Sequence, residues 1–224
     1  LGKEVKFHNG LRVTDKETME IVRMVLVGKV NKELVSLINH QGGPDPGLDS
    51  LAVGVSGDDG GLILAEKMTA PDIGFVGKVK RIEPTILNNL INDGFTPVVA
   101  SIGSGEDGES YNINADQVAA AVAVALKADK MIFLSDVPGL YRDFADRGSL
   151  ISVIDSAAGR KMVEDGGASE GMIPKIKACA EVVEAGIKRA HILDGTQPHA
   201  LLLEIFTDEG IGTMFTPANL GEAG

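Results

Sequence analysis

Apolar and polar positions change period in blocks along the chain, and each period predicts a helix or a strand. Helical spacing follows Thr14-Asp15-Lys16-Glu17, a capping-box sequence, and predicts a helix over Asp15–Val30. Further helical segments are predicted at Leu34–Ile38, from Pro84 to Gly94, over Asn114–Leu126, near Asp155–Glu164 and from Pro174 to Gly186. Short β-like runs lie between them, at Leu51–Val55, Gly61–Met68, Ile73–Ile82, Thr96–Ile102, Lys130–Ser135 and Arg189–Leu193.

The order of these elements predicts an α/β fold. Alternating strands and helices are typical of a three-layer αβα sandwich with a mostly parallel central sheet, which binds ligands near the carboxyl ends of its strands. The adjacent runs Gly61–Met68 and Ile73–Ile82 predict an additional β-hairpin. Since no linker interrupts the 224 residues, we expect a single domain over residues 1–224.

Composition and charge narrow the function classes. The 32 acidic residues outnumber the 21 basic ones, and a net charge of −11 disfavours binding to nucleic acid. Apolar runs such as Val118–Leu126 are too short to cross a bilayer, so no membrane association is expected. One cysteine, Cys179, and four scattered histidines offer neither a disulfide nor zinc-ligand spacing. A cytoplasmic protein without a metal centre of its own is predicted.

The hexapeptide Gly103–Gly108 matches G-x-G-x-x-G directly after a predicted strand, as a dinucleotide-binding turn would. Two carboxylates inside it would face a pyrophosphate, and residues Glu109–Asn112 look extended instead of helical. We therefore expect a turn here, not a cofactor site.

Four other short motifs carry groups suited to anionic ligands. Asn112 lies in an extended stretch that leads to Asn114, a helix cap or an amide ligand. Lys175 follows Pro174 at a helix start, where free N–H groups and an ammonium suit a phosphoryl group, although a single lysine is usually a solvated one. Arg12 precedes the first helix and is suited to a carboxylate or to a surface ion pair. Ser135–Leu140 is a Pro-Gly turn at the end of a strand.

Taken in order from about Asn9 to Phe215, these stretches resemble the N-acetyl-L-glutamate kinases of the amino-acid kinase family. The matching motifs are Asn-Gly-Leu-Arg-Val-Thr, Asn-Ile-Asn-Ala-Asp-Gln, Leu-Ser-Asp-Val-Pro-Gly-Leu, Gly-Met-Ile-Pro-Lys and the segment His199–Thr213. The resemblance implies phosphorylation of the γ-carboxylate of N-acetyl-L-glutamate by ATP, in arginine biosynthesis, with Mg²⁺ bound mainly through the nucleotide. A γ-carboxylate is already ionised at neutral pH, so the reaction needs positive charge and positioning more than a general base.

The resemblance also implies roles for individual residues. Lys175 would stabilise the transferring phosphoryl group, and Asp116 would orient lysines. Arg12, Asn112, Asn114 and Ala115 would bind the substrate. The implied nucleotide-binding residues are Ser135, Asp136, Val137, Pro138, Gly139, Leu140, Tyr141, Gly167, Ala168, Ser169, Gly171 and Met172. Residues 1–110 would belong to the lobe that binds the acylated amino acid, and residues 111–224 to the nucleotide-binding lobe.

Two further features of the family bear on this chain. Family members open with a strand and a glycine-rich loop that carry a second catalytic lysine, and nothing of that kind precedes Leu1. We therefore expect an N-terminally truncated chain that is inactive alone and exposes part of its core. The C-terminal segment resembles the arginine-inhibited branch, which implies an effector site at His191, Glu204, Gly210 and Gly212, arginine as feedback inhibitor, and a homo-oligomer for the complete protein. His191 and Glu204 are equally consistent with ordinary core and surface positions.

Three alternatives remain. The first is a related kinase for glutamate, aspartate, carbamate or an aminoadipate derivative. The second is a non-catalytic arginine-binding remnant, and the third is a nicotinamide-dependent oxidoreductase that uses the Gly103 loop. Substrate kinetics, arginine and ATP calorimetry, and NAD binding distinguish them.

Overall fold

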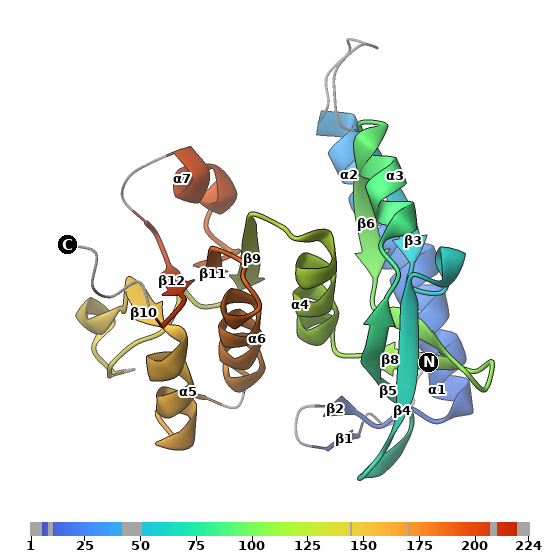
Figure 1. Cartoon of the computed structure of the whole chain (residues 1–224), viewed down its shortest axis with the longest axis horizontal. Coiled ribbons are helices and arrows are strands. Elements are labelled where there is room, and N and C mark those ends of the chain that lie inside the picture. Colours follow the sequence, from blue (N-terminus) through green and yellow to red (C-terminus); the bar gives the residue numbers. More distant parts are fainter. Residues whose placement is uncertain are drawn as a thin grey trace. The chain divides into compact units, whose positions relative to one another are not determined.

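The computed structural model describes residues 6–8, 11–41, 51–143, 145–169, 171–206 and 210–218. The chain forms two compact units, Leu1–Ala125 and Leu126–Gly224, which are described separately below (Figure 1). The division lies after Ala125, later than the lobe boundary expected at residue 110. Asn9 and Gly10 of the Arg12 motif, and residues 207–209 of the C-terminal motif, lie outside the described residues.

The first unit opens with two short strands, β1 (Phe7–His8) and β2 (Leu11–Arg12), and a long helical segment follows them. This segment consists of α1 (Lys16–Arg23), the π-helical turn η1 (Met24–Val30) and α2 (Asn31–Gln41). Asp15 is the N-cap, and its carboxylate accepts the Thr18 N–H at 2.8 Å. The helix predicted from Asp15 is therefore confirmed, and it runs without a break into the segment predicted at Leu34–Ile38.

The strands of the first unit form two groups. These elements are β3 (Ala52–Ser56), the 3₁₀ turn η2 (Asp59–Gly61), β4 (Ile63–Thr69), β5 (Asp72–Ile82), α3 (Thr85–Asn92), β6 (Thr96–Ala100), β7 (Ile102–Gly105), β8 (Ser110–Ile113) and α4 (Ala115–Leu126). Strands β3 and β6 pair in parallel, while β4, β5, β8 and β7 close into a small barrel. The β4–β5 pair is the predicted hairpin.

One strand prediction was wrong. Thr96–Ile102 was expected to be continuous, but β6 ends at Ala100 and β7 starts at Ile102. The chain bends at Ser101 because the two strands have different partners, β3 for β6 and the barrel strands for β7. The segment Gly103–Gly108 forms the end of β7 and the turn to β8, as expected of a turn, and β8 confirms that the next residues are extended.

The second unit contains one mixed sheet in the order β10-β12-β11-β9. Its elements are β9 (Lys130–Ser135), the 3₁₀ turn η3 (Arg147–Ser149), β10 (Val153–Asp155), α5 (Ser156–Glu164), α6 (Ile173–Glu184), β11 (Arg189–Asp194), α7 (Ala200–Phe206) and β12 (Thr213–Thr216). Strand β11 is parallel to β9 and antiparallel to β12, which in turn is parallel to β10. Strands β10 and β12 were not predicted. They have only three and four residues, which is too short to show an alternation of apolar and polar positions.

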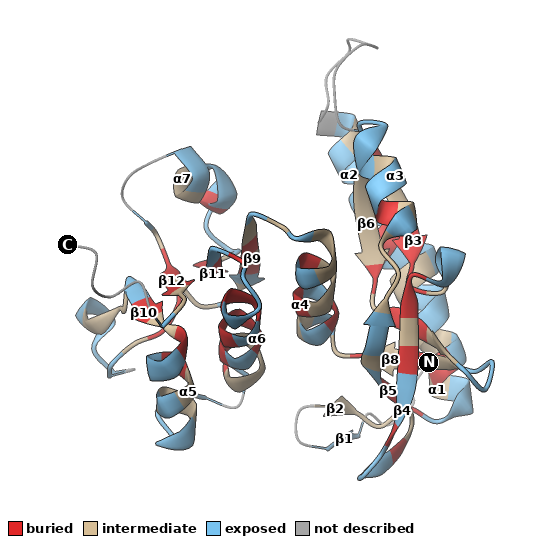
Figure 2. Cartoon of the chain, viewed as in Figure 1, coloured by how far each residue is buried: buried red, intermediate tan, exposed pale blue. Residues whose placement is uncertain are grey.

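Helices cover both faces of this sheet. Phe133, Ile192 and Phe215 share one face through the strand register, and the Phe215 ring packs against Gly159 of α5 and near Ile176 of α6. His191 points to the opposite face, where it contacts Glu204 of α7. Figure 2 shows the resulting concentration of buried residues on β11, β12 and the inner side of α6.

The fold class is confirmed. Parallel strand pairs occur in both units, helices pack on the sheets, and the β4–β5 hairpin accompanies them. Within the described ranges, no helix combines the length and the apolar composition that a membrane span requires.

Candidate active site

In the first unit, the segment that carries Arg12 is packed onto the β4–β5 hairpin. Leu11 and Val13 contact a buried cluster of Met68, Ile73 and Val76. The fully buried Thr14 forms a β-bridge with Gly74, which has φ +89° and no room for a Cβ beside the Thr14 carbonyl. Arg12 is therefore anchored by its neighbours on either side, and its guanidinium lies 5.0 Å from the centre of the Phe7 ring.

Asn112 lies on β8 and is joined to that same segment. Its Nδ2 donates to the Thr14 Oγ1 at 3.4 Å, and the Thr14 hydroxyl donates to the Arg12 carbonyl at 2.8 Å. The capping-box sequence predicted Thr14 as the helix cap, but Asp15 takes that place, and the Thr14 hydroxyl is directed to the Arg12 carbonyl instead. Arg12 and Asn112, expected to bind one substrate, are thus connected through a single buried threonine.

The neighbouring candidates lie at the start of α4. Asn114 caps this helix, since its Oδ1 accepts the N–H groups of Asp116 at 2.9 Å and Gln117 at 3.2 Å. Its side-chain oxygen is thereby used by the helix, which confirms the capping interpretation. Ala115 is exposed and Asp116 half-buried in the first turn. Asp116 belongs to the first unit and Lys175 to the second, so their cooperation stays a prediction.

The second unit contains a cavity of ≈ 670 Å³ at the carboxyl end of β9. Of the predicted nucleotide-binding residues, all but Pro138 line it, and Lys175 lines it too. Three further lining residues were missed by the sequence analysis, namely Arg142, Met162 and Gly166. Arg142 directly follows the predicted Tyr141, and Gly166 with φ +73° ends the turn after α5, but no motif marked them.

Two turns give the cavity its walls. The Pro138-Gly139 turn packs on the fully buried Thr213, whose hydroxyl accepts the Leu140 N–H at 2.8 Å. A Cβ on Gly139 would lie 3.0 Å from the Thr213 backbone nitrogen and closer still to its hydroxyl, so only glycine fits. At the other wall, the backbone carbonyl of Ser169 accepts hydrogen bonds from the N–H groups of Met172 and Ile173. These bonds set the start of α6.

Lys175 projects from the first turn of α6. Its Nζ lies 5.9 Å from the centre of the Phe133 ring, on the face of the sheet that α6 covers. The N–H groups of Met172 and Ile173 are already bonded to the Ser169 carbonyl and Pro174 has none, so the ammonium and the positive end of the helix dipole are what favour an anion here. This end of the cavity is consequently suited to phosphate groups.

The predicted effector residues meet on the other face of this sheet. His191 Nδ1 lies 2.6 Å from Glu204 Oε1, and the other Glu204 oxygen accepts the Ile211 N–H at 3.2 Å. Both side chains are buried. Burial lowers the pKa of His191, and the nearby Glu204 opposes that shift. Gly210 adjoins the Glu204 carboxylate, while Gly212 packs against the backbone of Ile192.

Comparisons with known proteins show what this chain is similar to. The profile of the Amino acid kinase family matches residues 1–194. An acetylglutamate kinase of Caldanaerobacter subterraneus subsp. tengcongensis is 53% identical over 215 residues, which cover 96% of this chain and 70% of that protein. An acetylglutamate kinase of Nostoc sp. is 51% identical over 214 residues, with coverages of 96% and 70%. The crystal structure of smu.665 from Streptococcus mutans UA159 superimposes with a TM-score of 0.78 at 30% identity, covering 96% of this chain and 78% of that one.

Proposed function

The chain belongs to the amino acid kinase family, and we propose that it phosphorylates the γ-carboxylate of N-acetyl-L-glutamate with ATP, as a step of arginine biosynthesis. The acetylglutamate kinases reported above, at 51–53% identity, support this substrate. The observation that carries the proposal is the cavity in the second unit, which gathers Lys175 and the glycine-rich loops. Its volume lies within the usual range for sites that hold small organic ligands.

The substrate groups suit the first unit. Arg12 would pair with the α-carboxylate, and the Asn112 amide would bind the acylated amino group. The backbone before Asp116 would complete this site at Asn114 and Ala115. Thr14 bonds to both the Asn112 amide and the Arg12 backbone carbonyl, so it holds the Arg12 backbone next to Asn112.

The phosphoryl transfer follows from charge and positioning. A γ-carboxylate oxygen attacks the γ-phosphorus of ATP, the bond to the bridging oxygen breaks, and ADP leaves with the electron pair. Lys175 at the start of α6 would stabilise the negative charge on the transferred group, and Asp116 would orient lysines. No proton has to be removed from the nucleophile.

Magnesium fits the same cavity. Among the described residues no group of three acidic, histidine or cysteine side chains could hold a metal ion. The cavity does present oxygen donors, in Ser135 and Asp136, beside the expected phosphates. This matches Mg²⁺, which is usually held by nucleotide oxygens, water and one or two carboxylates, and which would neutralise phosphate charge when bound.

We further propose arginine as a feedback inhibitor, with Glu204 as the group that recognises its guanidinium. The carboxylate is buried beside Gly210 and is held in place by His191 and the Ile211 N–H, so a guanidinium would have to take the place of the His191 contact. Calorimetric titration of arginine into the chain and into Glu204→Gln tests this, with loss of heat expected in the variant. Arginine binding to a chain that binds no ATP would favour the non-catalytic alternative.

A homo-oligomer and a cytoplasmic location complete the proposal. The helical segment from α1 to α2 is largely exposed or intermediate in burial (Figure 2), and a second copy would cover its exposed apolar residues. The exposed residues are Met24, Val25, Val30, Leu34, Leu37 and Ile38. Sedimentation of Leu37→Glu, expected to be smaller in mass than the unaltered protein, tests this face. A buried Cys179 as the single cysteine of the sequence suits a reducing compartment.

The central experiment traps the acyl phosphate product with hydroxylamine. N-acetyl-L-glutamate is compared with glutamate, aspartate, carbamate and an N-acylated aminoadipate. Because the chain matches 70% of the Caldanaerobacter relative, it is assayed alone and joined to the unmatched part of that relative. We expect turnover with N-acetyl-L-glutamate in the joined protein. Preference for another acceptor would contradict the proposed substrate.

A further inference from the structure

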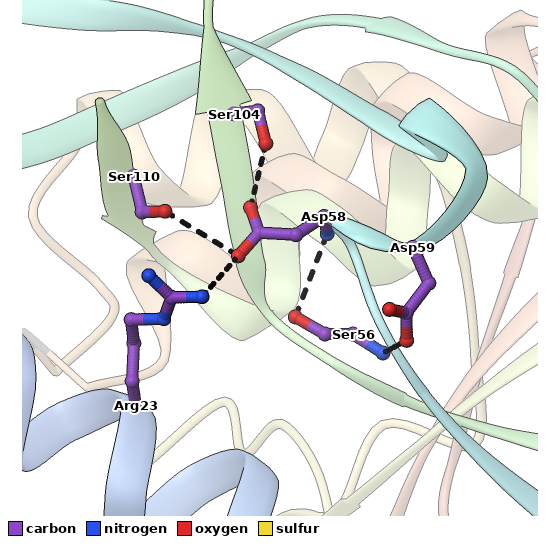
Figure 3. Close-up of polar contacts among 6 residues, drawn as sticks. All are labelled: Arg23, Ser56, Asp58, Asp59, Ser104 and Ser110. Atoms are coloured by element: carbon purple, nitrogen blue, oxygen red, sulfur yellow. Dashed lines mark hydrogen bonds and ion pairs between the residues drawn. The ribbon is translucent and has the colours of Figure 1, made fainter. Parts of the chain in front are cut away.

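Outside the residues assigned above, the first unit contains a polar cluster around Asp58 (Figure 3). Asp58 follows β3 in the turn that leads to β4, and 19% of its side chain is exposed. Its carboxylate accepts the Ser104 hydroxyl at 2.7 Å and the Ser110 hydroxyl at 3.3 Å. The Arg23 guanidinium lies 3.4 Å from the same carboxylate. One negative charge thus contacts three separate elements of the chain.

The turn that holds Asp58 is itself braced. The next residue, Asp59, accepts the Ser56 backbone N–H at 2.7 Å, and the Asp58 N–H points to the Ser56 hydroxyl at 3.5 Å (Figure 3). The Asp59 carboxylate therefore stabilises the turn itself, whereas the Asp58 carboxylate contacts side chains of other elements.

The serine contacts join the two strands next to the substrate residue. Ser104 of β7 and Ser110 of β8 are directly opposite each other in the antiparallel register. Ser110 and Asn112 are two residues apart on β8, so their side chains lie on the same face. Any shift of β8 relative to Asp58 would therefore move Asn112 as well.

The arginine contact ties the other substrate-binding segment to the same face. Arg23 is the last residue of α1, and Thr14, which receives the Asn112 amide, stands just before the cap of that helix. Helix α1 is consequently attached to β8 at both ends, through Thr14 and Asn112 at one end and through Arg23, Asp58 and Ser110 at the other.

We propose that Asp58 is a positioning residue for the N-acetyl-L-glutamate site. By holding α1 against β8, it sets the spacing between the Arg12 segment and the Asn112 amide. The inference rests on the proposed function for the identity of the substrate, but the positioning of Asn112 stands on the contacts of the first unit alone. Hydrogen bonds to a carboxylate are stronger than neutral ones, which suits a single group that must hold three partners.

The test compares Asp58→Asn with Glu106→Gln. Asparagine keeps the shape of Asp58. Its NH₂ group, however, cannot accept hydrogen bonds from Ser110 and Arg23, which both contact the same Asp58 oxygen, Oδ2. Glu106 is a matched control in the β7–β8 turn, since it forms an exposed ion pair with Lys80 at 2.7 Å. Two readouts are measured: the Asn112 side-chain amide resonance by NMR, and the dissociation constants of N-acetyl-L-glutamate and ATP by calorimetry.

We expect Asp58→Asn to shift the Asn112 amide resonance and to weaken N-acetyl-L-glutamate binding about tenfold, with ATP binding unchanged. Glu106→Gln should change neither. An Asn112 resonance that does not move, or equal weakening of both ligands, would overturn the proposal, because the second result indicates general destabilisation. If the unaltered chain binds no N-acetyl-L-glutamate, the proposed function fails, while the NMR comparison still decides the role of Asp58.

Discussion

In the first unit, the segments that carry the residues proposed to hold N-acetyl-L-glutamate are joined to one another. Thr14 bonds to the Arg12 carbonyl and the Asn112 amide, and Asp58 bonds to Ser110 on the strand of Asn112. In the second unit, the nucleotide cavity is lined by turns and glycines, and Lys175 supplies an ammonium at the helix start. By the proposed function, the first unit would recognise its ligand by segments already joined to one another. The second unit offers shape and positive charge.

This difference follows from what each ligand requires. A small dicarboxylic amino acid must be distinguished from its relatives, and fixed hydrogen-bonding partners do that at low cost in conformational entropy. A triphosphate carries much of its charge in a common, repeated group, which helix starts and lysines bind without detailed matching. Changes in the two units should therefore have separable effects.

The largest separation is expected from Lys175→Ala. Loss of the ammonium should reduce the rate of phosphoryl transfer on the order of 10²- to 10³-fold, while N-acetyl-L-glutamate binding to the first unit stays unchanged. Lys177→Ala is the matched control, because Lys177 lies on the same helix and is exposed. The rate is measured by hydroxylamine trapping in the joined protein. A similar loss in both variants would contradict a specific role for Lys175.

The next effect concerns packing. Gly139→Ala would push a methyl group into the buried Thr213 and should destabilise the chain by about 1–3 kcal/mol in urea unfolding. Gly28→Ala in the first unit meets no atom within 4 Å and removes a helix-disfavouring glycine, so it should be neutral or stabilising by up to about 1 kcal/mol. Equal stability of Gly139→Ala and the unaltered chain would show that the turn can move away from Thr213.

A smaller and more selective effect is expected from Asn112→Ala. Removing the amide takes away one substrate contact and the link to Thr14, so N-acetyl-L-glutamate binding should weaken about tenfold. Binding of ATP, measured by calorimetry on the same sample, should not change. Were ATP binding to weaken as much, the division of labour between the two units would be wrong.

The smallest effect is a pH dependence confined to the first unit. Burial, with the hydrogen bond to Asp107, raises the pKa of Tyr111 to about 12. In the unfolded chain the phenol ionises near pH 10, so the folded state retains its proton longer and loses stability as the pH rises from about 10 to 12. Urea unfolding at several alkaline pH values should show a smaller decline for Tyr111→Phe. Parallel declines would rule out this tyrosine as the cause.

Local sequence determined much of the fold. Asp15 caps its helix, Gly94 and Gly186 follow helix ends in left-handed conformations, and the β4–β5 hairpin forms where two β-like runs adjoin. These features depend on near neighbours in the chain, whose preferences are readable from residue type. The loops that line the cavity were expected from the family resemblance, and the residues within each loop are adjacent in sequence.

Tertiary structure alone decided the features that join distant segments. Strands β10 and β12 exist because β11 offers them a sheet, and the break at Ser101 arises from two competing sets of partners. The contacts of Asp58 with Ser104 and Ser110 connect residues 46 and 52 positions apart, and the Asn112–Thr14 contact spans 98. No periodicity or motif encodes such distances. The sequence thus determined which chemical groups the chain carries, and folding decided which of them meet, because long-range contacts depend on how whole elements pack.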